Sequence, residues 1–187
     1  MKLLLIILTV LSSFLSNLET RTLQSDFTVT VSEEVNAPMN YPGNITLCGE
    51  QFLLTMFGVE AAYDGKTLYM YNADIDELTL SHPTQQELLE ANPFLYARAL
   101  VDVCNVTERT NNDGKQTIIT LTPKDQSAGI NRFTLRVQTD DLIPLQIDIK
   151  EGKKNTTLKL KEPKFITTKQ EYKLVPDKNT FVNDMRL

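Results

Sequence analysis

Apolar and polar residues alternate along most of this sequence, and this pattern constrains the fold more than any other feature. It is clearest in four segments: 27–31 (FTVTV), 132–138 (RFTLRVQ), 145–150 (LQIDIK) and 157–161 (TLKLK). Successive side chains of a β-strand point to opposite faces, so each segment presents one apolar and one polar face. Turn residues recur about every ten residues, as in an antiparallel meander that curls into a barrel or half-barrel. We therefore predict a single, mainly β (α+β) domain.

One segment departs from this alternation and is typical of helix. Thr84 and Glu87 have the spacing of a capping box, in which each side chain bonds the backbone of the other residue. Asn92-Pro93 then predicts a second helix start, with Asn as the cap and Pro at the first helical position, running to about Val103. A shorter helix, over about residues 14–23, is expected near the N-terminus, where one helical face is apolar: Leu11, Phe14, Leu15 and Leu18.

The first residues resemble a signal peptide. Met1-Lys2 is followed by an apolar run, Leu3 to Leu11, that is too short to span a bilayer as a helix. We expect residues 1–13 to be a signal peptide, 14–187 to be the single domain, and the protein to be exported. Asp and Glu number 24 against 19 Lys and Arg, a formal charge of -5, and no basic block occurs. Nucleic acid is therefore not an expected partner.

The sequence offers little for catalysis. His82 is the only histidine, and it precedes Pro83 at a strand-to-helix junction. We interpret it as a loop residue, and we predict no catalytic site, no metal site and no cofactor. Cys48 and Cys104 are far apart in the chain. They are either a disulfide, which an exported protein allows, or two separate thiols that act as small hydrophobes.

A strong hairpin signal occurs at Asp64-Gly65, because glycine adopts the positive φ of a tight turn without steric cost. The surrounding segment, YDGKTLYMYN at 63–72, resembles the hairpin of the LolA-like outer-membrane lipoprotein carriers. Further similarities are a lid segment at 92–95 (NPFL) and a strand at 118–123 (IITLTP). The tail at 181–187 (FVNDMRL) is similar to the C-terminus of family members from Bacteroidetes.

The resemblance implies an incomplete antiparallel β-barrel with a helical lid over an apolar cavity. It also implies a monomeric, non-enzymatic carrier in the periplasm. Such a carrier takes acylated lipoproteins from an inner-membrane ABC transporter and delivers them to an outer-membrane acceptor. The residues expected to line the acyl cavity and lid are Phe27, Val29, Phe52, Leu54, Met56, Tyr69, Leu89, Phe94, Leu95, Phe133 and Leu135. Periodicity alone does not separate a cavity lining from an ordinary packed core, so both interpretations stay open.

The sequence departs from the family at the arginine that controls the lid, whose place is taken here by Cys48 or Gly49. Two other functions compete with the carrier. One is an envelope-stress or lipid-sensing interaction module on the same half-barrel. The other is a small secreted hydrolase, which the single histidine and the lack of catalytic motifs disfavour.

Overall fold

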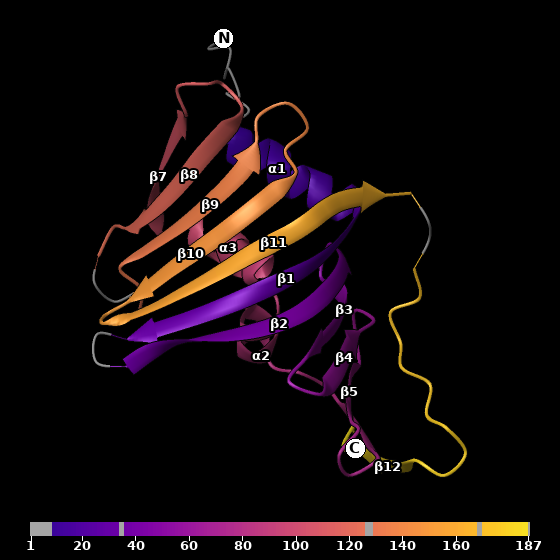
Figure 1. The fold of residues 1–187 in the computed structure, drawn as a ribbon. Coiled ribbons are helices and arrows are strands. Elements are labelled where there is room, and N and C mark those ends of the chain that lie inside the picture. Colours follow the sequence, from indigo (N-terminus) through magenta and orange to yellow (C-terminus); the bar gives the residue numbers. More distant parts are fainter. Residues whose placement is uncertain (1–8, 34–35, 126–128, 168–169, 187) are drawn as a thin grey trace.

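The computed structural model describes residues 9–33, 36–125, 129–167 and 170–186, and most of them form strands of one sheet (Figure 1). The sheet has 12 strands. In chain order they are β1 Thr22–Glu33, β2 Asn36–Cys48, β3 Gln51–Met56, β4 Val59–Tyr63, β5 Leu68–Asn72, β6 Glu77–Ser81, β7 Cys104–Thr110, β8 Gln116–Pro123, β9 Arg132–Gln138, β10 Pro144–Glu151, β11 Lys154–Ile166 and β12 Phe181–Asp184.

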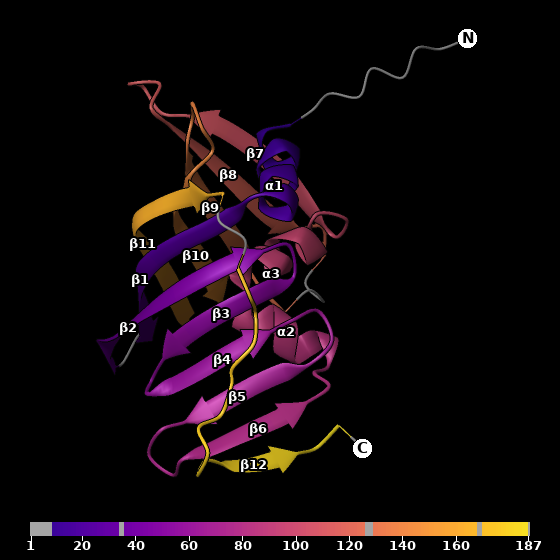
Figure 2. The same ribbon diagram turned by 90° about the vertical axis from the view of Figure 1, so that its right-hand side faces the viewer.

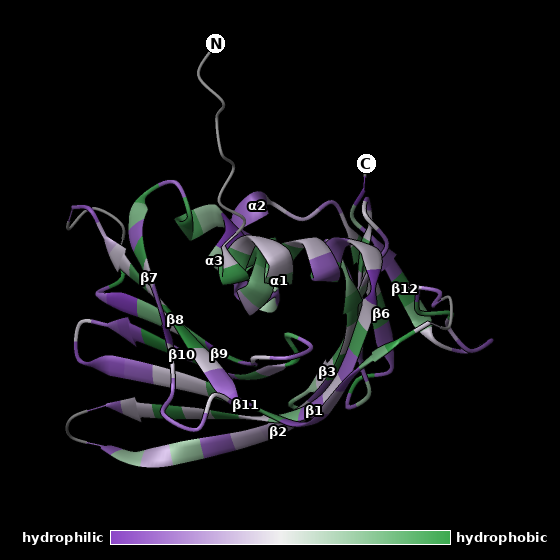
Figure 3. Ribbon diagram, turned by 90° about the horizontal axis from the view of Figure 1, so that it is seen from above, coloured by the Kyte–Doolittle hydropathy of each residue, from purple (hydrophilic) through white to green (hydrophobic). Residues whose placement is uncertain are grey.

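The strands are arranged in the order β12-β6-β5-β4-β3-β2-β1-β11-β10-β9-β8-β7. Every neighbouring pair is antiparallel except β12, which lies parallel to β6. The two edges of the sheet do not pair, so the barrel is incomplete. Seen from above, the sheet curves around the helices (Figure 3). This open sheet with helices in its concavity confirms the predicted fold class.

Three helices lie against the concave face: α1 Val10–Thr20, α2 Gln85–Ala91 and α3 Pro93–Leu100. The capping box of α2 is confirmed, because the Thr84 side chain and the Glu87 side chain each bond the other residue's backbone. Asn92 caps α3, where its Oδ1 accepts the N–H groups of Phe94 and Leu95. Among the residues described, no helix is long and apolar enough to cross a membrane.

The N-terminal helix differs from the predicted range of 14–23. It begins at Val10, because Thr9 serves as the N-cap, and the backbone is already extended at Arg21. Residues 1–8 of the predicted signal peptide lie outside the described residues. Leu11 is 2% exposed within α1. A cleavage after residue 13 would divide this helix, and the boundary at that residue stays a prediction.

The core lies on the concave face, where the register aligns apolar residues across strands. Paired residues of neighbouring strands share a face, and one such row is Leu23, Leu47, Phe52, Tyr63 and Leu68. All five are buried.

Gly43 is required beside this core. A Cβ there would lie 2.4 Å from Cζ of Phe27 and 2.5 Å from the carbonyl oxygen of Thr55. The absence of a side chain on β2 is therefore what lets the ring of Phe27 pack over this strand.

The convex face carries a second, smaller apolar layer near β6. Residues 170–180 run as an extended strap that reaches β12, across the outside of the sheet (Figure 2). Leu78 of β6 is 2% exposed, and Tyr172, at the start of the strap beside Thr22 and Cys48, is 7% exposed. Leu78 and Tyr71 line one hollow together with Lys173 and Leu174 of the strap. The strap therefore covers outward-facing apolar residues that would otherwise meet water.

The turn between β4 and β5 contains the Asp64-Gly65 signal, but its loop has four residues, 64–67. Gly65 has φ +97°, the positive value that the sequence indicated. Oδ1 of Asp64 accepts the N–H groups of Lys66 at 2.9 Å and Thr67 at 2.8 Å, and Oδ2 accepts the Tyr69 hydroxyl at 3.0 Å. Burial acts to raise the pKa of Asp64, but the hydrogen bonds from Thr67, Lys66 and Tyr69 outweigh it, so the pKa is lowered.

Asp64→Ala is expected to lower the free energy of unfolding by about 1 kcal/mol at pH 7, because these hydrogen bonds to a carboxylate are lost. A carboxyl whose folded pKa is lowered stabilises the fold above its unfolded pKa of about 3.9, and this contribution is lost as pH falls further. Urea unfolding at pH 7 and pH 3 should therefore show the difference from the wild type shrinking at pH 3. The control is Asp74→Ala, which removes a carboxylate without such a set of hydrogen bonds; an equal loss there would contradict the prediction.

Candidate functional site

The candidate site is the concave face and the helices that cover it. The structure brings eight of the eleven expected residues together there. Phe27, Phe52, Phe94, Phe133 and Leu135 are in one buried cluster, and Val29, Leu54 and Met56 pack against it while partly exposed. Phe52, Phe133 and Leu135 are 0% exposed. The deep part of the expected cavity is therefore filled by side chains in this structure.

Three expected residues are not part of this cluster. Leu89 and Leu95 are half-buried on α2 and α3. Tyr69 lies on the opposite face of the sheet, which corrects its assignment to the cavity. The register pairs Phe52 with Tyr63 and Tyr63 with Leu68, so Leu68 faces the concavity and Tyr69, one residue on, faces outward.

The helices fill the concavity with aromatic and aliphatic side chains. Phe14 of α1 is 0% exposed, and its ring centroid lies 5.8 Å from that of Phe94 on α3. Tyr96 of α3 meets Phe133 of β9 edge to face, with 6.2 Å between the ring centroids. The helices are thus seated on the sheet by ring contacts that an apolar ligand would have to replace.

Polar contacts hold α1 at both ends. The Glu108 carboxylate on β7 accepts the N–H groups of Val10 at 3.1 Å and Leu11 at 2.9 Å. A negative charge there complements the helix dipole. At the other end, Gly49 N–H donates to the carbonyl oxygen of Leu18 at 2.6 Å, and Arg98 of α3 pairs with Glu19.

These contacts lie where the resemblance to lipoprotein carriers would place an arginine that controls the lid. The turn at Cys48-Gly49 holds α1 through the backbone N–H of Gly49, without an arginine. The Cys48 thiol lies 3.7 Å from the carbonyl oxygen of Glu19. No local sequence signal pointed to Glu108 or Arg98, because their partners are distant in the chain.

The half-buried apolar side chains mark where the concave face opens to solvent. We call this group the apolar mouth: Val29, Leu54, Met56, Ala61 and Leu88, all partly buried and packed against the core. Met70, in register with Ala61, is 44% exposed beside it. At the adjoining β3–β4 turn, Phe57 is 61% exposed and its ring lies 4.5 Å from that of Tyr41. Of these residues, sequence reasoning missed Ala61, Leu88, Met70, Phe57 and Tyr41.

Cys104 is a member of the buried cluster on this face, whereas Cys48 and His82 are not. Cys48 on β2 and Cys104 on β7 are both free thiols, so the disulfide interpretation is not realised in this structure. Five strands lie between β2 and β7 in the sheet. His82 is exposed, with Nδ1 3.1 Å from the carbonyl oxygen of Lys66. Burial raises the pKa of the Cys104 thiol, which favours its neutral form.

Comparison with known proteins gives one family match and several similar structures. Residues 62–181, more than half of the chain, match the family described as outer membrane lipoprotein carrier protein LolA. An uncharacterized conserved protein from Thermus thermophilus is 16% identical with a TM-score of 0.60, and the alignment covers 93% of this chain and 96% of that one. MucB is 14% identical with a TM-score of 0.54, covering 92% of this chain and 64% of MucB.

A LolA superfamily protein from Nitrosomonas europaea is also similar, at 10% identity and a TM-score of 0.41, covering 84% of this chain and 94% of that one. No curated protein sequence matches the chain significantly. The likenesses to the Thermus protein and to MucB show a shared fold. The Bacteroidetes affiliation of the C-terminal segment stays a prediction.

Proposed function

This chain belongs to the LolA family of outer membrane lipoprotein carrier proteins, and on that premise we propose that it binds the acyl chains of lipoproteins at the apolar mouth. It would do so in the periplasm, after export, as a monomer and without catalysis or a cofactor. Its donor would be an inner-membrane ABC transporter, and its acceptor would lie at the outer membrane.

The observation that carries this proposal is a continuous apolar face that is buried at one end and open at the other. Val29, Leu54 and Met56 belong to the same face as the buried Phe52 and Phe133, and they remain partly exposed. A monomeric globular protein rarely leaves clustered apolar side chains exposed unless they bind something. The apolar mouth therefore offers a start for an acyl chain, which would enter deeper as the helices move outward.

The energetics fit a carrier better than a permanent binding protein. Each buried methylene contributes about 0.8 kcal/mol, so one long acyl chain is stabilised by on the order of 10 kcal/mol when it leaves water. Opening the lid offsets part of this, because ring contacts such as Tyr96–Phe133 must be lost. A carrier that has its own side chains as competitors binds its cargo less tightly and releases it more readily.

A fluorescent apolar probe tests the proposal. The probe is expected to bind the purified chain and to be displaced by an acylated lipoprotein but not by its unacylated form. Met56→Asp should weaken probe binding about tenfold, because it places a charge in the apolar mouth. The matched control is Met185→Asp, since Met185 is 57% exposed in the tail, and it should bind as the wild type does.

Two outcomes would count against the carrier. If the probe does not bind, the concave face is only a packed core, and the interaction module considered from the sequence becomes the better interpretation. Displacement by the unacylated lipoprotein would show that the acyl chain is not the recognised group.

A further inference from the structure

Five of the 19 Lys and Arg residues of this acidic chain lie together on one part of the convex face. The formal net charge is -5. The outward positions of β9, β10 and β11 nevertheless carry a group of cations: Arg132, Arg136, Lys150, Lys159 and Lys161. This face is on the other side of the sheet from the apolar mouth, and the proposed carrier function leaves it without a role.

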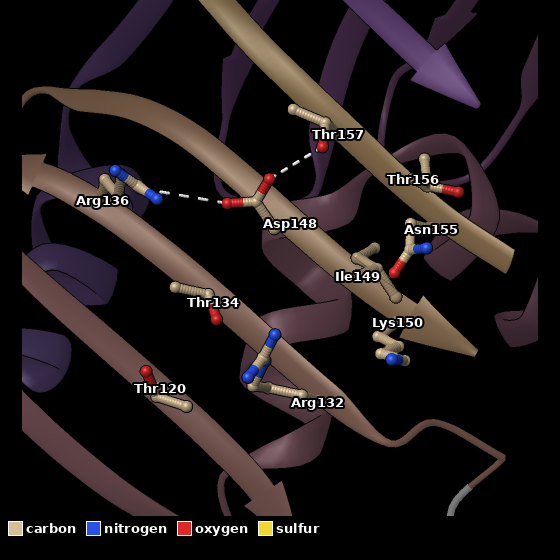
Figure 4. A pocket seen from close by; sticks show the side chains of 10 residues that line it. All are labelled: Thr120, Arg132, Thr134, Arg136, Asp148, Ile149, Lys150, Asn155, Thr156 and Thr157. Carbon is tan, nitrogen blue, oxygen red and sulfur yellow. Dashed lines mark hydrogen bonds and ion pairs between the residues drawn. The ribbon is translucent and has the colours of Figure 1, made fainter. Parts of the chain in front are cut away.

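The register builds a trough across these strands. The floor of the trough is a row of short side chains that are register partners on successive strands, from β8 through β9 and β10 to β11. They are Thr120, Thr134, Asp148 and Thr157. One side of the trough is formed by Arg132, Lys150 and Asn155, which lie next to one another in the register of β9, β10 and β11. On the other side lies Arg136. The hollow between them has a volume of about 430 Å³ (Figure 4).

Asp148 is the one carboxylate among the described residues that line the trough, and it already has partners. Asp148 accepts hydrogen bonds from the Thr157 hydroxyl and the Gln146 amide, each at 2.8 Å, and lies 3.9 Å from Nε of Arg136. Arg132 and Lys150 make no side-chain hydrogen bond or ion pair with the described part of the chain, and Nε of Arg136 is buried without a hydrogen-bond partner. The trough therefore presents two exposed cations, Arg132 and Lys150, beside the buried Nε of Arg136.

We propose that this trough binds a phosphate group. Arginine forks bind phosphate oxygens with two parallel hydrogen bonds, and lysine adds a point charge. The floor adds the hydroxyls of Thr120 and Thr134 as further donors. Three cations against one engaged carboxylate suit a group with several charged oxygens. The phosphate is either free or part of a lipid headgroup, and the chemistry of the trough is the same for both.

In the first test, inorganic phosphate is titrated into the full chain, and the backbone amide NMR signals report binding. The signals of Arg132, Thr134 and Lys150 are expected to shift together and to saturate. In Arg132→Gln/Lys150→Gln, affinity should fall about tenfold or more. The matched control is Lys66→Gln, which removes a cation from the distant β4–β5 turn and should leave the titration unchanged. Thermal unfolding of each variant checks that the fold is kept.

A second arm separates the two sources of phosphate. Sedimentation with phosphatidylglycerol vesicles, compared with phosphatidylcholine vesicles, should show binding that the double variant loses and the control keeps if a lipid headgroup is the ligand. Saturable binding of inorganic phosphate without vesicle binding supports a free phosphate ligand. The proposal is overturned if neither probe binds, or if the double variant binds as well as the wild type. The phosphate titration does not depend on acyl binding, and in the vesicle arm the double variant and the phosphatidylcholine vesicles separate binding at the trough from acyl binding at the apolar mouth.

Discussion

Replacing Phe133 with alanine is expected to lower the free energy of unfolding by about 3 to 5 kcal/mol. Phe133 is 0% exposed on the inner face of β9, and its ring packs edge to face with Tyr96 of α3. Truncation removes this buried surface and leaves a cavity between the sheet and the helix. Relaxation of the backbone fills only a small part of that cavity. Urea unfolding of the wild type and the variant measures the difference.

The matched control is Phe57→Ala, the same chemical change on the β3–β4 turn, where the ring is 61% exposed. Phe57→Ala should lower the free energy of unfolding by no more than about 0.5 kcal/mol. A double-mutant cycle with Tyr96→Ala should give a coupling energy of about 0.5 to 1.5 kcal/mol, as for other aromatic pairs. Equal losses in the two single phenylalanine variants, or no coupling, would show that α3 is not seated on β9 in solution.

Local structure was largely predictable from the sequence, because its causes lie within a few residues. The Thr84 and Glu87 side chains reach each other across one helical turn, and Asn92 caps α3 through its own neighbours. The turns at Gly49 and Gly152 also have a local cause, because glycine adopts their positive φ values of +58° and +57° without steric cost. Alternation also predicted the strands of the second half, since their inward residues are the buried ones.

Contacts between distant segments were not predictable in the same way. The parallel pairing of β12 with β6 joins residues about a hundred positions apart, and nothing in either segment specifies the partner. Leu78 and Leu80 alternate like any inward pair, yet they face outward. They are buried because the strap packs over β6 and β12 lies beside it. Both segments come from the far end of the chain.

For the candidate site, the sequence identified the apolar face but not whether that face is filled or open to a ligand. Periodicity places Phe52 and Phe133 on the inner side of their strands, and it is silent on whether helices or a ligand fill the space above them. The face of Tyr69 depends on its pairing with Ala62, and alternation within one strand does not specify that register. The contact between Glu108 and the N-terminus of α1 was not predictable for a similar reason, because a carboxylate on a strand does not by itself indicate its partner.

Phe14→Asp is expected to detach α1 and to increase binding of the fluorescent apolar probe about tenfold. Phe14 is 0% exposed and packs against Phe94, so a carboxylate there would lose its solvation or force the helix outward. Burying an unpaired charge costs several kcal/mol. The polar contacts of α1, through Glu108 and Gly49, contribute about 1 kcal/mol each and do not offset that cost. Release of α1 uncovers apolar side chains that the probe then reaches.

The matched control is Ser16→Asp, which places the same carboxylate on the exposed side of α1 and should leave probe binding unchanged. Glu108→Gln is the milder variant if Phe14→Asp does not fold, and it should raise probe binding in the same direction by a smaller factor. Hydrogen exchange of the α1 amides reports whether the helix has detached. Faster exchange without a rise in probe binding would mean that α1 does not cover the acyl site, and the lid would then have to be α2 and α3 alone.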